Sequence, residues 1–170
     1  MSQGANVFEG RADSLPPTLQ VAVVVSRYNE SITKRLLDAA VATFTTAGLP
    51  AAQIDVAWVP GAFELPCIAD QLAASGRYAA VLCLGAIIRG ETTHDQHIAR
   101  AVSTGIEVIA REWGLPVLFG VLTCDTLAQA LARAGGDAAS GYIGNKGAEC
   151  ASAAIEMIAL IASLPDRDPS

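Results

Sequence analysis

Apolar positions along the chain alternate between short continuous runs and longer segments with helical spacing. The continuous runs cover residues 19–26, 54–59, 78–88 and 116–123, and they are rich in aliphatic side chains. Such runs are typical of strands buried on both faces of a sheet. The pattern therefore predicts four buried strands.

The segments between these runs carry apolar residues every three or four positions. In the clearest one, residues 93–113, a single stripe is formed by Ile98, Val102, Ile106, Ile109 and Trp113. Similar patterns predict helices over 30–47, 63–74, 127–134 and 148–164. Strands that alternate with helices indicate an α/β fold, with a parallel sheet and helices on both of its faces.

The ends of the predicted strands locate a candidate site. Ligands of parallel α/β sheets bind outside the carboxyl ends of the strands. The loops expected at that edge are 27–29, 61–64, 89–94 and 124–125. We therefore expect the functional residues in these four loops.

Composition narrows the class of protein. The length of 170 residues suits a single domain over 1–170, with a polar arm over 1–17 and a short tail over 165–170. The net charge of −6 argues against a nucleic-acid partner, although it leaves room for a local anion site. No apolar run is long enough for a membrane span, and the N-terminus lacks a signal pattern, so we expect a cytoplasmic protein without membrane contact.

The four cysteines lie in or beside apolar segments, and none belongs to a CxxC pair. This pattern predicts small buried thiols rather than disulfides or a metal site.

The loop 89–94 contains the most candidate functional residues. Thr92 or Thr93 can cap the following helix, and the free N–H groups of a helix start attract anions. His94 would lie in the first turn, as a proton-transfer group or as an exposed residue of a plain helix start. His97, one turn further on, has no evident partner in the sequence.

The other loops are ambiguous when each is taken alone. Tyr28 follows the first strand and could face a ligand or pack against the protein. Glu64 could bind a ligand or be a solvated acid at a helix start. Lys146 could belong to a second anion cradle or to a plain glycine turn. No phosphate-binding P-loop, GxGxxG or HExxH motif occurs.

Six segments together carry a resemblance to a known family. They are RYNE, VPGAFELP, GAIIRGETTH, PVLFGVLT, RAGG and GNKGAEC. In order and spacing the chain resembles the 6,7-dimethyl-8-ribityllumazine synthases from about residue 21 to about residue 160.

The resemblance implies an enzyme of riboflavin biosynthesis. It would condense 5-amino-6-(D-ribitylamino)uracil with 3,4-dihydroxy-2-butanone 4-phosphate, with neither cofactor nor metal. It also implies a flavodoxin-like three-layer sandwich and a ring of five subunits. Active sites would lie between neighbours, and the N-terminal segment would add a strand to the adjacent subunit's sheet. The alternative is a carrier of flavin or lumazine with little catalysis.

The resemblance also implies roles for individual residues. Tyr28 would stack on the pyrimidine, with Asn29 beside it. The ribityl chain would be held by Ala62, Phe63 and Glu64, and the pyrimidine side lined by Ala86, Ile87 and Ile88. Phosphate would bind at Glu91, Thr92 and Thr93, and His94 would transfer protons. Phe119 and Arg133 would come from the neighbouring subunit. Lys146 is a weaker candidate for the same anion, and Glu149 would pair with the histidine.

Two departures from the family pattern stand out. Asp95-Gln96-His97 replaces the aromatic-acid-aromatic run that commonly follows the histidine. The linker over 136–143 is longer than in members that build sixty-subunit shells, and it lacks their lysine. We therefore expect a free pentamer.

Overall fold

The computed structural model describes residues 4–11 and 14–165. Its sheet consists of β1 (Val21–Ser26), β2 (Ile54–Val59), β3 (Ala80–Ile88) and β4 (Val117–Cys124), in the order β2-β1-β3-β4. All three neighbouring pairs are parallel. The strand ends are in register, because Ser26 pairs with Val59 and Ile88 with Cys124. The predicted parallel sheet is confirmed, and its carboxyl ends form one edge.

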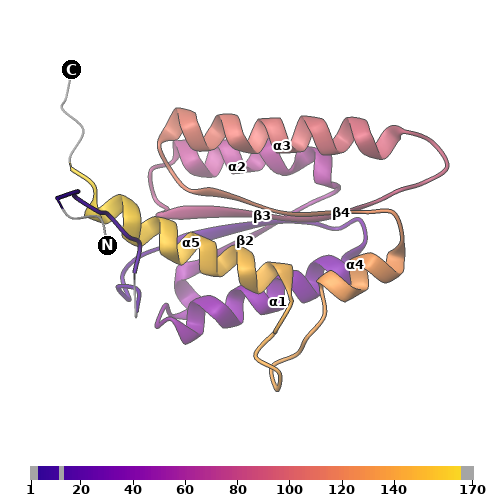
Figure 1. Cartoon of the computed structure of the whole chain (residues 1–170). Helices are drawn as coiled ribbons and strands as arrows, with labels where there is room; N and C mark the ends of the chain where they lie inside the picture. The colour runs from indigo at the N-terminus through magenta and orange to yellow at the C-terminus, as the bar shows by residue number, and fades with distance from the viewer. Residues whose placement is uncertain (1–3, 12–13, 166–170) are drawn as a thin grey trace.

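Helices cover both faces of this sheet (Figure 1). One layer contains α1 (Glu30–Thr46), α4 (Leu127–Arg133) and α5 (Lys146–Ser163), and the other contains α2 (Leu65–Ala74) and α3 (His94–Trp113). Two 3-10 turns, η1 (Ala51–Gln53) and η2 (Ala62–Glu64), flank β2. The expected three-layer α/β fold is therefore confirmed.

The continuous apolar run of β1 has a direct structural cause. Val23 and Val25 face the core under α1 and α5, whereas Ala22 and Val24 face the core under α2 and α3. Every position of β1 is buried, so both faces are apolar from Val21 to Val25, and only the last residue, Ser26, is polar.

Two helices begin two residues away from their predicted starts. Residues 62–64 form η2, so α2 begins at Leu65. α5 begins two residues early, at Lys146, because the buried side chain of Asn145 accepts hydrogen bonds from the backbone N–H groups of Gly147 and Ala148. The expected threonine cap of α3 is wrong: Thr93 occupies the N-cap position, but its side chain makes no capping hydrogen bond.

Three of the four cysteine thiols are buried as predicted, namely Cys83, Cys124 and Cys150, and all four are free. Cys67 is exposed, so the expectation of burial is wrong there. The buried stripe of α2 runs through residues 65, 69 and 73, and Cys67 lies off this stripe.

The N-terminal arm forms no strand in its described part, residues 4–11 and 14–17. Gly10 approaches α5 so closely that a Cβ atom there would overlap the carbonyl oxygen of Glu156. Residues 1–3 and 12–13 of the arm and 166–170 of the tail lie outside the described residues. No helix in the described part of the chain is long and apolar enough to span a membrane.

Candidate active site

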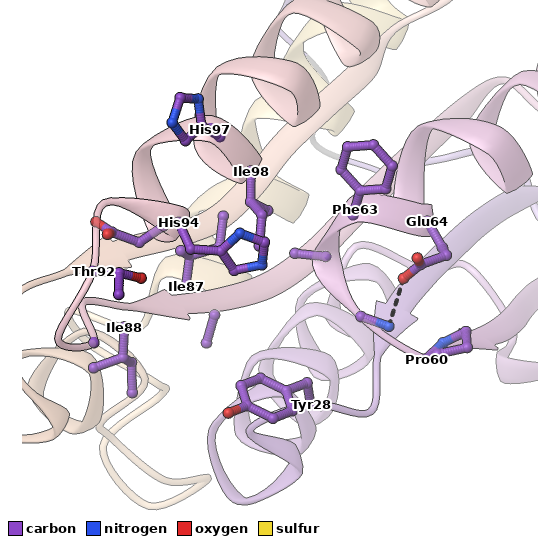
Figure 2. Close-up of a pocket in the computed structure, with 15 residues that line it drawn as sticks. Tyr28, Pro60, Phe63, Glu64, Ile87, Ile88, Thr92, His94, His97 and Ile98 are labelled. Atoms are coloured by element: carbon purple, nitrogen blue, oxygen red, sulfur yellow. Dashed lines mark hydrogen bonds between the residues drawn. The ribbon is translucent and has the colours of Figure 1, made fainter.

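A cavity of about 770 Å³ opens where the carboxyl ends of β1, β2 and β3 meet the first turns of α3 (Figure 2). We call it the main cavity. Nine residues singled out from the sequence line it: Tyr28, Ala62, Phe63, Glu64, Ala86, Ile87, Ile88, Thr92 and His94. Three separate stretches of the chain thus meet in one hollow, as expected at this edge of a parallel sheet.

The loop after β1 holds an aromatic ring at the cavity wall. The backbone N–H of Arg27 donates to Val59 O at 2.8 Å, and that of Tyr28 donates to Pro60 O at 3.0 Å. These bonds tie the loop after β1 to the loop after β2. The Tyr28 side chain is 73% exposed, so it packs little against its own chain. The ring is therefore available to a ligand.

Glu64 also lines the cavity, within η2 in the loop that follows β2. Its Oε2 accepts a hydrogen bond from the backbone N–H of Gly61 at 2.9 Å, which fixes the carboxylate beside the cavity (Figure 2). A carboxylate can accept several hydrogen bonds, so this one leaves capacity for ligand hydroxyls. The neighbouring ring of Phe63 is 60% exposed and adds an apolar surface.

The floor and one end of the cavity come from β3 and the start of α3. Ala86 and Ile87 are buried, and they bring small and branched apolar surfaces to the floor. His94 lies in the first turn of α3, and its ring projects toward the side of Phe63 and Glu64 (Figure 2). Because no side chain caps this helix, the N–H groups of its first turn can meet an anion.

Two residues that the sequence did not single out for the site also line the cavity. Asp95 presents a carboxylate whose Oδ1 is buried and has no hydrogen-bond partner among the described residues. His97 lies one turn beyond His94, a three-residue spacing that puts both on one side of α3, and its ring points away from Tyr28 (Figure 2). This three-residue spacing is the sequence signal that places His97 beside His94.

The remaining predicted residues lie elsewhere. Asn29, Glu91 and Thr93 belong to the loops of the main cavity but do not line it. A second pocket of about 370 Å³ between β4, α4 and α5 contains four others, namely Phe119, Arg133, Lys146 and Glu149. Within one chain, therefore, Glu149 and His94 line different pockets.

The second pocket joins an exposed aromatic ring to a set of charges. Phe119 projects from the edge strand β4 and is 45% exposed. Lys146 Nζ lies 2.6 Å from Glu149 Oε2. Burial raises the pKa of the Cys124 thiol at the end of β4, and the nearby guanidinium of Arg133 opposes that rise. A positive charge thus lies close to the carboxyl edge of the sheet.

Comparison with family models matches residues 18–162 to the family described as 6,7-dimethyl-8-ribityllumazine synthase. The chain belongs to this family. Membership supports a lumazine synthase function in riboflavin biosynthesis, which is that of a transferase enzyme. It also implies small-molecule substrates and an oligomeric assembly.

The matched residues 18–162 include the loops of the main cavity and the strand and helices of the second pocket. The part of the chain that the structure describes holds no group of three or more His, Cys, Asp or Glu residues that could bind a metal ion.

Proposed function

We propose that this chain condenses 5-amino-6-(D-ribitylamino)uracil with 3,4-dihydroxy-2-butanone 4-phosphate, the penultimate step of riboflavin biosynthesis. The products are 6,7-dimethyl-8-ribityllumazine, phosphate and water. One observation carries the proposal: nine motif residues from three separate stretches of a lumazine synthase family member line a single cavity. The enzyme works in the cytoplasm as a single domain, without cofactor or metal.

The pyrimidine lies in a slot between an aromatic ring and an apolar floor. Tyr28 stacks on one face of the heterocycle, and the segment 86–88 lines the other side. The ribityl chain runs toward η2, where Ala62 and Phe63 flank it. Glu64, held by Gly61 N–H, accepts hydrogen bonds from the ribityl hydroxyls.

The phosphate of the second substrate binds at the start of α3. The hydroxyl groups and backbone of Glu91, Thr92 and Thr93 surround it, and the N-terminal end of the helix dipole stabilises its charge. Arg133 of the neighbouring subunit completes the anion site. One arginine and one helix start suffice for this, so the acidic net charge of the chain is no obstacle.

The reaction needs proton transfers and close placement of two substrates. The 5-amino group attacks the ketone carbonyl and forms a Schiff base with loss of water. Elimination of phosphate from C4 then leaves an enol at C3, which tautomerises to a ketone. The ribitylamino nitrogen closes the ring onto this new carbonyl with loss of a second water. His94 moves protons in these steps. Since the amine is already a good nucleophile, holding the two substrates together supplies most of the rate.

The complete site is shared between subunits of a pentameric ring. The second pocket supplies Phe119 and Arg133 to the main cavity of the neighbour, with Lys146 as a weaker contact and Glu149 beside the neighbour's histidine. The N-terminal arm adds a strand to the adjacent sheet. The long linker over 136–143 obstructs contacts between pentamers, so a particle near sixty subunits in light scattering would overturn this assembly.

A carrier of flavin or lumazine is the second candidate, because the same cavity would hold the product. Incubation with both substrates separates the two functions. We expect the fluorescence of the lumazine to increase with time and to depend on both substrates. Tight binding of both without turnover would support the carrier instead.

A further inference from the structure

The turn between β1 and α1 has an unusual backbone at Asn29. Its φ of 62° and ψ of 41° lie in the left-handed region, which asparagine adopts more readily than most residues. Tyr28, whose ring lies at the main cavity, immediately precedes it. The backbone geometry of residue 29 therefore helps to set the direction of the aromatic side chain.

The side chain of Asn29 links this turn to a distant part of the sheet. Its Nδ2 donates a hydrogen bond to the carbonyl oxygen of Ala86 at 2.8 Å, across 57 positions of sequence. Ala86 belongs to β3 and lines the main cavity, whereas Asn29 does not line it. The amide thus connects, from behind, the two walls between which the pyrimidine is proposed to lie.

Further bonds make the same turn rigid. The carbonyl of Asn29 accepts hydrogen bonds from the N–H groups of Ile32 at 2.9 Å and Thr33 at 3.1 Å. The fully buried Thr33 donates its hydroxyl to Ser26 O at 2.7 Å. Several hydrogen bonds thus hold the turn against α1. The Asn29 amide then fixes the distance between this turn and β3.

We infer that Asn29 is a positioning residue for the condensation, not a residue that touches substrate. It sets the spacing between the Tyr28 ring and the wall at Ala86, and so the width of the pyrimidine slot. This inference rests on the proposed function of the main cavity. The phosphate site at the start of α3 does not depend on this link, so the effect is confined to one of the two substrates.

Two variants remove the hydrogen bond to Ala86 but keep the left-handed backbone at residue 29. Asn29→Gly keeps the left-handed conformation but removes the donor. Asn29→Asp keeps the size and tolerates the same backbone, but an ionised carboxylate cannot donate to Ala86 O. For both we expect the KM for the pyrimidine to rise about tenfold, the effect of losing one hydrogen bond. The KM for the butanone phosphate should stay within about twofold, because the anion site keeps its own contacts.

A matched control distinguishes positioning from general stability. Tyr78→Phe removes a side-chain hydrogen bond to Asp55 at the far end of the sheet. It should lower the melting temperature without changing either KM. Melting curves of all variants, recorded together with the kinetics, show whether each chain is folded. If Asn29→Gly does not fold, Asn29→Asp provides the test.

The outcomes decide between the alternatives. Folded Asn29 variants with wild-type KM for the pyrimidine, or with both KM values raised equally, would overturn the positioning role. If the wild type forms no lumazine, the proposed function fails on its own. Equilibrium binding of the pyrimidine to the same variants then still decides the role of Asn29, with a dissociation constant about tenfold higher expected and an unchanged one contradicting it.

Discussion

His94 projects from the uncapped start of α3 into a cavity whose walls are mostly apolar (Figure 2). Its imidazole is suited to moving protons between substrates that are already aligned. Tyr28 and Glu64 are suited to aligning the substrates, because hydrogen bonds hold both of their loops at the cavity wall. At the residue scale, therefore, positioning and proton transfer fall to different side chains.

Replacement of the histidine tests this separation. His94→Ala should lower kcat by about 10²-fold, at the low end of general acid–base effects, and leave measurable lumazine formation. Steady-state kinetics with both substrates provide the measurement. Complete loss of turnover with intact substrate binding would show that proton transfer, not positioning, dominates.

Arg133 should act on one substrate only. If Arg133 binds the phosphate as proposed, Arg133→Ala should raise the KM for the butanone phosphate about tenfold or more, with a smaller effect on the pyrimidine. Arg100→Ala is the control, because Arg100 is an exposed arginine of α3. Equal effects of the two variants would contradict the assignment.

At the scale of elements, periodicity predicted all four strands and five helices, because each buries one stripe or face. It misplaced the starts of α2 and α5, which depend on local polar bonds rather than on apolar spacing. Asn145 shows the reason: its buried amide caps α5 and also donates to Arg35 O of α1 at 3.4 Å, a contact between segments 110 positions apart. Such tertiary bonds leave no periodic signal.

The contact between α1 and α5 depends on a glycine. A Cβ atom at Gly147 would overlap the carbonyl oxygen of Leu36, which is backbone and cannot move aside cheaply. Gly147→Ala should therefore lower the free energy of unfolding by about 1–3 kcal/mol or more in urea titrations. Gly90→Ala, where the added methyl meets open space, should change it by less than about 1 kcal/mol. Similar values for both variants would refute the close contact.

A tyrosine connects the start of β3 to the edge strand β2, and its contribution to the free energy of unfolding depends on pH. Tyr78 donates its hydroxyl to Asp55 Oδ2 at 2.6 Å, and this hydrogen bond, together with burial, raises the pKa of Tyr78. Because the folded-state pKa of Tyr78 lies above the unfolded value of about 10, the hydrogen bond contributes fully to the free energy of unfolding below pH ~10. It is lost as pH rises through the folded pKa.

The difference in unfolding free energy between the wild type and Tyr78→Phe should therefore be constant near neutral pH and shrink above pH ~10. Urea unfolding at several pH values measures it. A difference that grows with pH would have the wrong sign for this bond.

On the scale of the whole molecule, the motif residues divide between two pockets on different sides of the sheet edge. The order of the motifs along the chain carries no information about this division. A helix such as α4 follows β4 closely in sequence, yet its Arg133 lines the second pocket and not the main cavity. One chain thus keeps Arg133 apart from His94, which agrees with the proposed sharing of the site between subunits.

Mixed assemblies test whether the site is shared. His94→Ala keeps an intact second pocket, and Arg133→Ala keeps an intact main cavity. Subunits of both kinds, unfolded together and reassembled in equal amounts, should regain about one quarter of the wild-type sites, because each interface needs the intact half from each partner. The assay is run with butanone phosphate below its KM. Activity equal to the average of the two separate variants would exclude a shared site.

The most direct test of the proposed condensation follows both products of one reaction. Wild-type protein is mixed with the pyrimidine and the butanone phosphate, and the lumazine is quantified by fluorescence and mass spectrometry while phosphate is measured in parallel. We expect lumazine and phosphate to form in equal amounts, and neither product to form when either substrate is omitted. Binding of both substrates without lumazine, or phosphate release without lumazine, would contradict the proposed condensation.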